Sequence, residues 1–244
     1  MLFNTTLLLI LVIIFFASLL RSTFGFGDAL ISMPLLALFL SIKTVTPLVA
    51  FMGLLISTAI LARNWERIDI RSFWKLILFA LLGIPIGLIY LKGAGESFVK
   101  IVLAVVLILF SCYKILNPDL FNLKNDKLAF IFGLLSGILG GAYNTNGPPI
   151  IVFGTLRGWQ PNKFRLILQG IFFPTNLFIV AGHGAAGLWT QEVIRYFLLS
   201  LPFMLIAIII GSKLNKIIPK DKFMNYIYIL LIVISCLLLW KTIF

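Results

Sequence analysis

Two short polar runs interrupt an otherwise apolar sequence, and both contain residues that could bind a small anion. The first covers residues 21–28, with the sequence RSTFGFGD, and the second covers residues 140–149, with the sequence GGAYNTNGPP. Irregular backbone at membrane depth is tolerated only where protein or a water-filled cavity satisfies its polar groups. We therefore expect two breaks in membrane-buried helices, which face each other across an anion site.

The second run predicts the start of a short helix over 148–157. A proline pair suits the first turn of a helix, and Asn146 or Gly147 would be its N-cap. The free N–H groups and the positive end of the helix dipole would then face an anion. Alternatively, the polar side chains only cap helix ends in a packed turn. The residues of this run that we expect to line the site are Asn144, Thr145, Asn146, Gly147 and Pro148.

The first run contains two charged residues. Asp28 begins the next segment, where an acidic residue suits the N-cap. It is also a candidate for proton coupling, because removal from water favours a neutral carboxyl group. Arg21 could bind an oxyanion through two hydrogen bonds or pair with Asp28. If the first segment is a plain membrane span, its side chain would instead reach the membrane interface.

The segment 162–181 carries two amides, Gln169 and Asn176, seven residues apart and therefore on one helical face. They would either join neighbouring helices or line the pocket. Ser32 is a weaker candidate for the site, because small hydroxyls commonly serve close helix packing. The single histidine, His183, is expected in a flexible loop on the outer face rather than in a proton relay.

The composition is that of an integral membrane protein. Of 244 residues, 61% are hydrophobic and only 11% are charged, far from the balance of a soluble domain. The net charge of +12 does not indicate a nucleic-acid partner, because the basic residues lie in short connections between apolar segments. No sequence motif of an enzyme, a cofactor site or a metal site is recognisable. We expect one transmembrane domain over residues 1–244.

Apolar runs bounded by charges, glycine and proline predict the helices of an all-α polytopic protein. The segment 148–157 is too short to cross a membrane, because ten helical residues rise only about 15 Å. The expected segments are 5–22, 28–42, 44–62, 72–91, 98–116, 127–143, 148–157, 162–181, 190–211 and 222–243.

Basic residues predict the orientation of these segments. The connections richest in lysine and arginine should be cytoplasmic, and they are 63–75, 114–127, 157–165 and 213–222. Residues 127–157 would then enter and leave on the cytoplasmic face as a hairpin, and residues 5–42 would do so from the outer face. Lys43, Lys92, Lys100, Arg195 and Lys241 would lie outside.

This pattern predicts two inverted repeats, over residues 1–120 and 121–244. Each repeat would contain one hairpin with a broken tip and three transmembrane helices. Gly27, Pro34 and Pro47 recur at one constant spacing as Gly141, Pro148 and Pro161. Broken helices in corresponding positions of inverted halves indicate the binding site of a transporter.

These motifs resemble the sulfite exporter TauE/SafE family. The resemblance covers essentially the whole chain, and the motifs are Gly25-Phe26-Gly27 followed by Pro34, Gly137-Ile138-Leu139-Gly140-Gly141 leading to Asn146-Gly147-Pro148-Pro149, and Gln169-Gly170. It implies a bacterial or archaeal secondary transporter of small sulfur anions such as sulfite, sulfonates or thiosulfate, and in some members of carboxylates. The site residues that it implies are Gly25, Gly27, Asn144, Thr145, Asn146, Gly147, Pro148 and Gln169.

The expected function is thus transport of a small sulfur anion by alternating access, with Arg21 as a countercharge and Asp28 as a candidate proton carrier. The protein would lie in the prokaryotic cell (inner) membrane, surrounded by lipids, and a homodimer is a candidate assembly. The alternatives are a carboxylate transporter, a passive anion channel and a membrane scaffold without transport.

Overall fold

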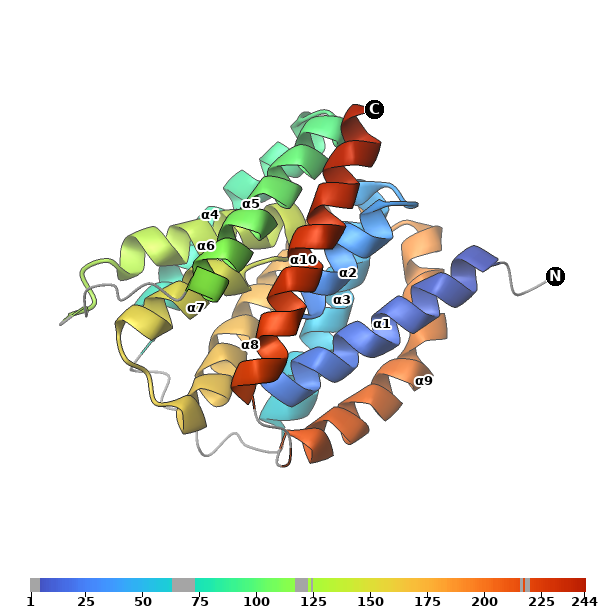
Figure 1. Ribbon diagram of the computed structural model, residues 1–244. Helices are drawn as coiled ribbons and strands as arrows, with labels where there is room; N and C mark the ends of the chain where they lie inside the picture. Colours follow the sequence, from blue (N-terminus) through green and yellow to red (C-terminus); the bar gives the residue numbers. More distant parts are fainter. Residues whose placement is uncertain (1–4, 63–72, 117–122, 124, 216, 218–219) are drawn as a thin grey trace.

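The computed structural model describes residues 5–62, 73–116, 123, 125–215, 217 and 220–244, with backbone alone for 161–163 and 220–223. These residues form helices and no strand (Figure 1). The helices are α1 (Thr5–Phe24), α2 (Asp28–Ala37), α3 (Ile42–Leu61), α4 (Trp74–Gly93), α5 (Glu96–Leu116), α6 (Ala129–Tyr143), α7 (Gly147–Leu156), α8 (Pro161–Ala185), α9 (Gln191–Leu214) and α10 (Lys220–Ile243).

The expected helices are confirmed, with ends that differ by a few residues. The largest differences are at α2, which ends at Ala37 rather than at residue 42, and at α8, which continues to Ala185. Helix α7 is short, as expected, and α2 is equally short with 10 residues. In the described part of the chain, seven helices are long and apolar enough to cross a membrane, and the first is α1. One arm of the first hairpin therefore has the length of a full span.

Glycines bring α4 and α6 into backbone contact. Methyl groups added at Gly137 and Gly141 would lie 2.0 and 2.2 Å from the carbonyl oxygens of Ala80 and Ile84, and one at Gly87 would lie 2.1 Å from that of Ile138. Small residues permit such close approach of helices in membranes, where packing and hydrogen bonds replace the hydrophobic driving force. This contact holds α6, and with it the second break, against α4.

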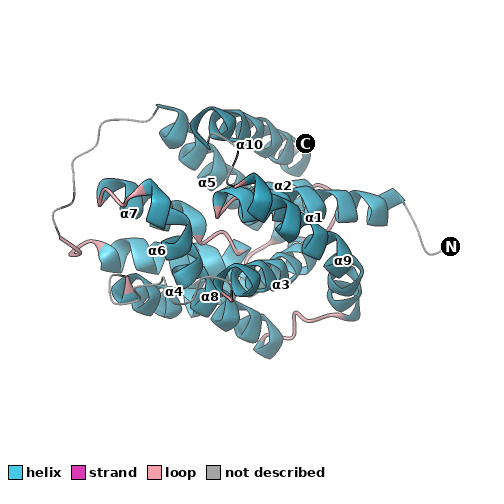
Figure 2. Ribbon diagram, turned by 90° about the horizontal axis from the view of Figure 1, so that it is seen from below, coloured by secondary structure: helices cyan, strands magenta, loops and turns pink. Residues whose placement is uncertain are grey.

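The most extensive helix contacts join the two halves of the chain. Helix α1 packs on α9, and α6 packs on α4. Helix α3 packs on α8, and α5 packs on α10. Seen from below, α2 and α7 lie between the α5–α10 pair and helices α3, α4 and α8 (Figure 2). The inversion of the second half relative to the first remains a prediction from the charge pattern.

Contacts between connections agree with part of that charge pattern. Arg157 forms an ion pair with Asp126 at 3.0 Å, so α6 begins and α7 ends at the same end of the bundle, as a hairpin. At another site, Lys43 Nζ donates to the carbonyl oxygen of Lys92, and both residues are expected outside. The basic connection 63–72 lies outside the described residues, as do Lys124 and Lys216.

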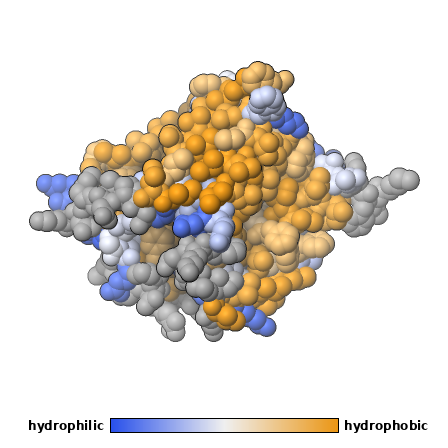
Figure 3. Space-filling model, viewed as in Figure 1, coloured by the Kyte–Doolittle hydropathy of each residue, from blue (hydrophilic) through white to orange (hydrophobic). Residues whose placement is uncertain are grey.

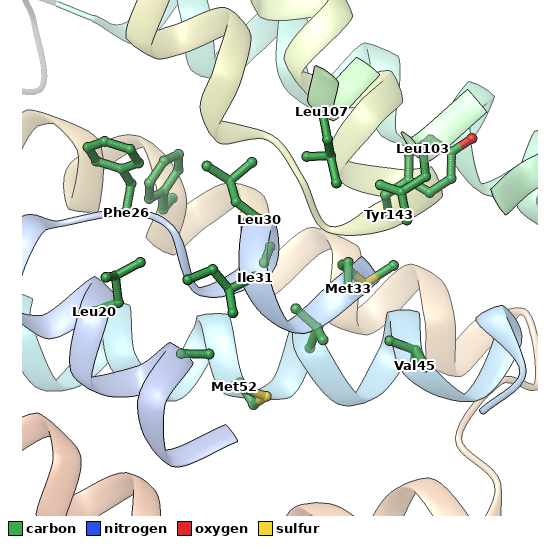
Figure 4. Packing of buried hydrophobic residues seen from close by; sticks show 14 of the residues in the cluster. Leu20, Phe26, Leu30, Ile31, Met33, Val45, Met52, Leu103, Leu107 and Tyr143 are labelled. Atoms are coloured by element: carbon green, nitrogen blue, oxygen red, sulfur yellow. The ribbon is translucent and has the colours of Figure 1, made fainter. Parts of the chain in front are cut away.

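Apolar side chains cover the outside of the bundle and fill its centre. The face shown in Figure 3 is largely hydrophobic. On α10, Ile229, Val233 and Leu237 are exposed. Inside, Leu30 of α2 lies between Met52 of α3 and Leu107 of α5 (Figure 4). The hydrophobic surface suits a lipid environment, and the buried position of α2 keeps the first break away from lipid.

Candidate functional site

The two breaks meet at one small hollow. It is lined by both helix starts and by one side chain of α8, namely by Phe26, Gly27, Asp28, Ala29, Leu30, Asn144, Thr145, Asn146, Gly147, Pro148 and Phe172. The first N–H groups of a helix have no partner within the helix and attract anions. The volume is about 10 Å³, enough for one water molecule. A hollow of this size is too small for an oxyanion with three or four oxygens.

Glycine permits the geometry of the first break. Gly25 and Gly27 have φ angles of +94° and +106°, a region that side chains rarely adopt. A methyl group at Gly25 would lie 2.7 Å from Cγ of Arg165. The expectation that Asp28 is the N-cap of α2 is wrong: Gly27 occupies that position and Asp28 is the first helical residue. Its carboxylate is therefore free to turn towards α1.

A buried ion pair links this break to α1. Arg21 Nη1 donates to Asp28 Oδ2 at 2.7 Å, and both side chains are at most 5% exposed. Arg21 Nη2 donates to Ser57 Oγ at 2.6 Å and to Gln169 Oε1 at 3.3 Å. The guanidinium group also stacks over the ring of Phe172, 5.0 Å from its centroid. Arg21 is thus paired with Asp28 in this structure, and its buried side chain does not reach the surface of the bundle.

Side chains of the second break bond to other helices. Asn144 ends α6 with a φ of 52°, and its Nδ2 donates to the carbonyl oxygen of Val49 at 3.0 Å. Asn146 occupies the N-cap position of α7, but its side chain caps nothing and donates to Thr175 Oγ1 at 3.1 Å. Pro148 lies in the first turn of α7, as expected. Pure capping is therefore the wrong description of these amides.

Helix α8 carries the two expected amides to the breaks. Gln169 Nε2 donates to the carbonyl oxygen of Gly25 at 2.5 Å, and Asn176 Nδ2 donates to Ser57 Oγ at 3.4 Å. Both side chains are buried, and both link helices beside the hollow without lining it. Ser32 is also buried, but its hydroxyl donates to the backbone of Asp28 and does not line the hollow.

The sequence did not indicate the role of Gly53 on α3. A methyl group there would lie 2.9 Å from Asn176 Nδ2 and 3.1 Å from both Arg21 Nη1 and Asn144 Nδ2. The absent side chain allows these three nitrogens to approach one point. The only available signal is a pair of small residues, Gly53 and Ser57, one helical turn apart in an apolar segment, and most such pairs serve helix packing.

Arg165 of α8 forms hydrogen bonds to the ends of two other helices. Its Nη2 donates to the carbonyl oxygen of Ser22 at 2.6 Å, and its Nη1 donates to Asn215 Oδ1 at 3.1 Å. Asn215 donates in turn to the carbonyl oxygen of Thr23. Arg165 lies within the expected segment 162–181, in the first turns of α8, and it bonds to the ends of α1 and α9. The sequence could have indicated this role, because Arg165 precedes Gln169 by four residues and therefore lies on the same face of the helix.

His183 was placed incorrectly in a loop. It lies within α8, is buried, and its Nε2 is 3.3 Å from the carbonyl oxygen of Gly141. Gly182 and Gly184 on either side of it are helical as well, because α8 continues to Ala185.

Comparison with known proteins places these features in a family. The family model described as "Sulfite exporter TauE/SafE" matches residues 10–238. The protein "Probable sulfite/organosulfonate exporter TauE" of Cupriavidus necator is 22% identical over 176 residues, which cover 70% of this chain and 69% of the relative. No solved structure matches.

Proposed function

The chain belongs to the sulfite exporter TauE/SafE family, and we propose that it moves a small sulfur oxyanion across the cell membrane through the hollow between the two breaks. One observation carries the proposal: the starts of α2 and α7 face a single hollow beside the buried pair Arg21 and Asp28. The relative from C. necator is named a probable exporter of sulfite and organosulfonates, which supports this class of substrate and a transporter rather than an enzyme.

The anion competes with Asp28 for Arg21. In the described site, Arg21 already contacts a carboxylate at 2.7 Å, and a second anion beside it would be repelled by Asp28. In a low-dielectric interior such repulsion is strong. Protonation of Asp28 removes it and frees Arg21 Nη1 for the substrate. Proton and anion then enter together, and the loaded site gains no net charge.

Transport further requires the closed site to open alternately to each side. The contacts of Arg165 with Ser22 and Asn215 tie α8 to α1 and α9 at the end that we expect to be cytoplasmic. These bonds would break when the site opens inward. Rocking of one half against the other around a central site is the usual mechanism of transporters with broken helices.

Uptake of sulfite by proteoliposomes tests the proposal. We expect saturable, gradient-driven uptake, and we expect Asn146→Ala to lower it about tenfold, because a hydrogen bond at the second break is worth about 1.4 kcal/mol. Ser111→Ala is the control, since Ser111 is buried on α5 without a partner among the described residues. Flux that does not saturate would indicate a channel, uptake of small carboxylates alone would change the substrate class, and no flux of any anion would leave only a scaffold role.

The pH dependence of uptake tests the role of Asp28. We expect wild-type uptake to rise as the pH falls, because protonated Asp28 releases Arg21. Asp28→Asn keeps the shape of the side chain but has no proton to exchange, so its uptake should be nearly independent of pH. The measurement is the initial rate of uptake over a pH series at constant substrate charge, with methanesulfonate as substrate. An unchanged pH profile in the variant would rule out proton coupling through Asp28.

A further inference from the structure

We propose that the site selects a monoanion that carries a hydrogen-bond donor, such as a hydroxyl group, over dianions and over monoanions without a donor. This inference rests on the proposed function and specifies the ligand of the same site. It follows from two buried acceptor atoms that lack a donor and from the balance of charge around Arg21.

The two acceptors are the amide oxygens of Asn144 and Asn176. Both side chains are at most 2% exposed, and no described residue donates to either Oδ1 atom. A buried acceptor without a donor costs about 1–3 kcal/mol. Asn144 lines the hollow between the broken helices and Asn176 lies beside it, so these atoms indicate a ligand that supplies the missing hydrogen bond.

The orientation of both amides is determined by their neighbours. Asn144 must turn its NH₂ group to Val49, whose carbonyl oxygen can only accept. Ser57 donates its hydroxyl proton to the carbonyl oxygen of Gly53 at 2.7 Å, so it can only accept from Asn176. Exchanging nitrogen and oxygen in either amide would place two acceptors against each other. The unpaired atoms are thus oxygens.

The two amides and the positive charge lie close together. The amide nitrogens and Arg21 Nη1 are all within 3.1 Å of the point where a methyl group on Gly53 would lie. Asn144 also lines the hollow. A ligand that contacts Arg21 through an oxyanion group can therefore reach these amides with a neighbouring group. A hydroxyl there would donate to one of these acceptors, whereas a methyl group leaves them unpaired.

The charges favour a single negative charge on the ligand. Among the described residues that line the hollow or bond to its lining side chains, Arg21 is the one cation and Asp28 the one anion. With Asp28 protonated, Arg21 neutralises a monoanion. A dianion would leave one uncompensated charge in a low-dielectric site, which is strongly unfavourable.

The inference is tested by comparing the dissociation constants of two matched pairs of ligands with the purified protein. We expect 2-hydroxyethanesulfonate to bind about tenfold more tightly than ethanesulfonate, because it differs by one donor that meets a buried acceptor. We expect methanesulfonate to bind at least about tenfold more tightly than sulfate, which has nearly the same shape and one more charge. Dissociation constants come from calorimetric titration in detergent.

A variant tests whether the amide of Asn176 causes the preference for the ligand with a hydroxyl group. Asn176→Leu removes one acceptor, and we expect the ratio between 2-hydroxyethanesulfonate and ethanesulfonate to fall from about ten towards one. Ser111→Ala should leave the ratio unchanged. Equal binding of both sulfonates by the wild type, or tighter binding of sulfate than of methanesulfonate, would overturn the inference and leave the proposed function standing. Absence of any sulfonate or sulfite binding would overturn both.

Discussion

Arg21→Ala is expected to abolish anion transport and to lower the free energy of unfolding by about 3–5 kcal/mol. The change removes the partner of a buried carboxylate, because Asp28 is paired with Arg21 at 2.7 Å and is only 4% exposed. It also removes a hydrogen bond to Ser57 and the contact with Gln169. The uncompensated charge on Asp28 dominates the loss of stability.

A double variant separates stability from function. Arg21→Met combined with Asp28→Leu replaces the ion pair with apolar side chains, and such replacements of buried pairs are often neutral or stabilising. We expect the double variant to melt close to the wild type and still not to transport sulfite, since the countercharge for the anion is gone. The measurements are thermal melting in detergent and proteoliposome uptake. Transport by a well-folded double variant would show that Arg21 is not the countercharge.

Gly137→Ala is expected to lower the free energy of unfolding by about 3 kcal/mol, at the upper end of the usual cost of overpacking. The added methyl group would lie 2.0 Å from the carbonyl oxygen of Ala80. The obstacle is backbone, so no side-chain rotation relieves it, and α4 and α6 must separate. Because α6 ends at the second break, transport activity should fall along with the melting temperature.

Gly93→Ala is the matched control on α4. Outside its own stretch of α4, a methyl group at Gly93 meets no atom within 4 Å, and alanine is the better helix former by up to about 1 kcal/mol. We therefore expect a melting temperature equal to or above that of the wild type. A loss of stability in Gly93→Ala as large as that in Gly137→Ala would show that the backbone contact between α4 and α6 is not the cause.

The sequence by itself determined the class of fold and the position of both breaks. A membrane span must be continuously apolar and must satisfy its backbone polar groups within the helix. Polar and glycine-rich runs such as 21–28 and 140–149 therefore stand out locally, without reference to any other part of the chain. The short helix α7 and its proline start followed from the same local rules and are confirmed.

Only the tertiary structure decided which atoms the polar side chains contact. Arg21 meets Gln169 and Asn144 meets Val49 across more than 90 residues of sequence. A hydrogen bond needs two atoms within about 3 Å in a suitable direction, and no local pattern specifies such long-range partners. For the same reason, the approach of three side-chain nitrogens to Gly53 and the buried position of His183 were not predictable from the sequence. Local hydrophobicity placed the breaks along the chain, and packing of distant helices brought them together around one ion pair.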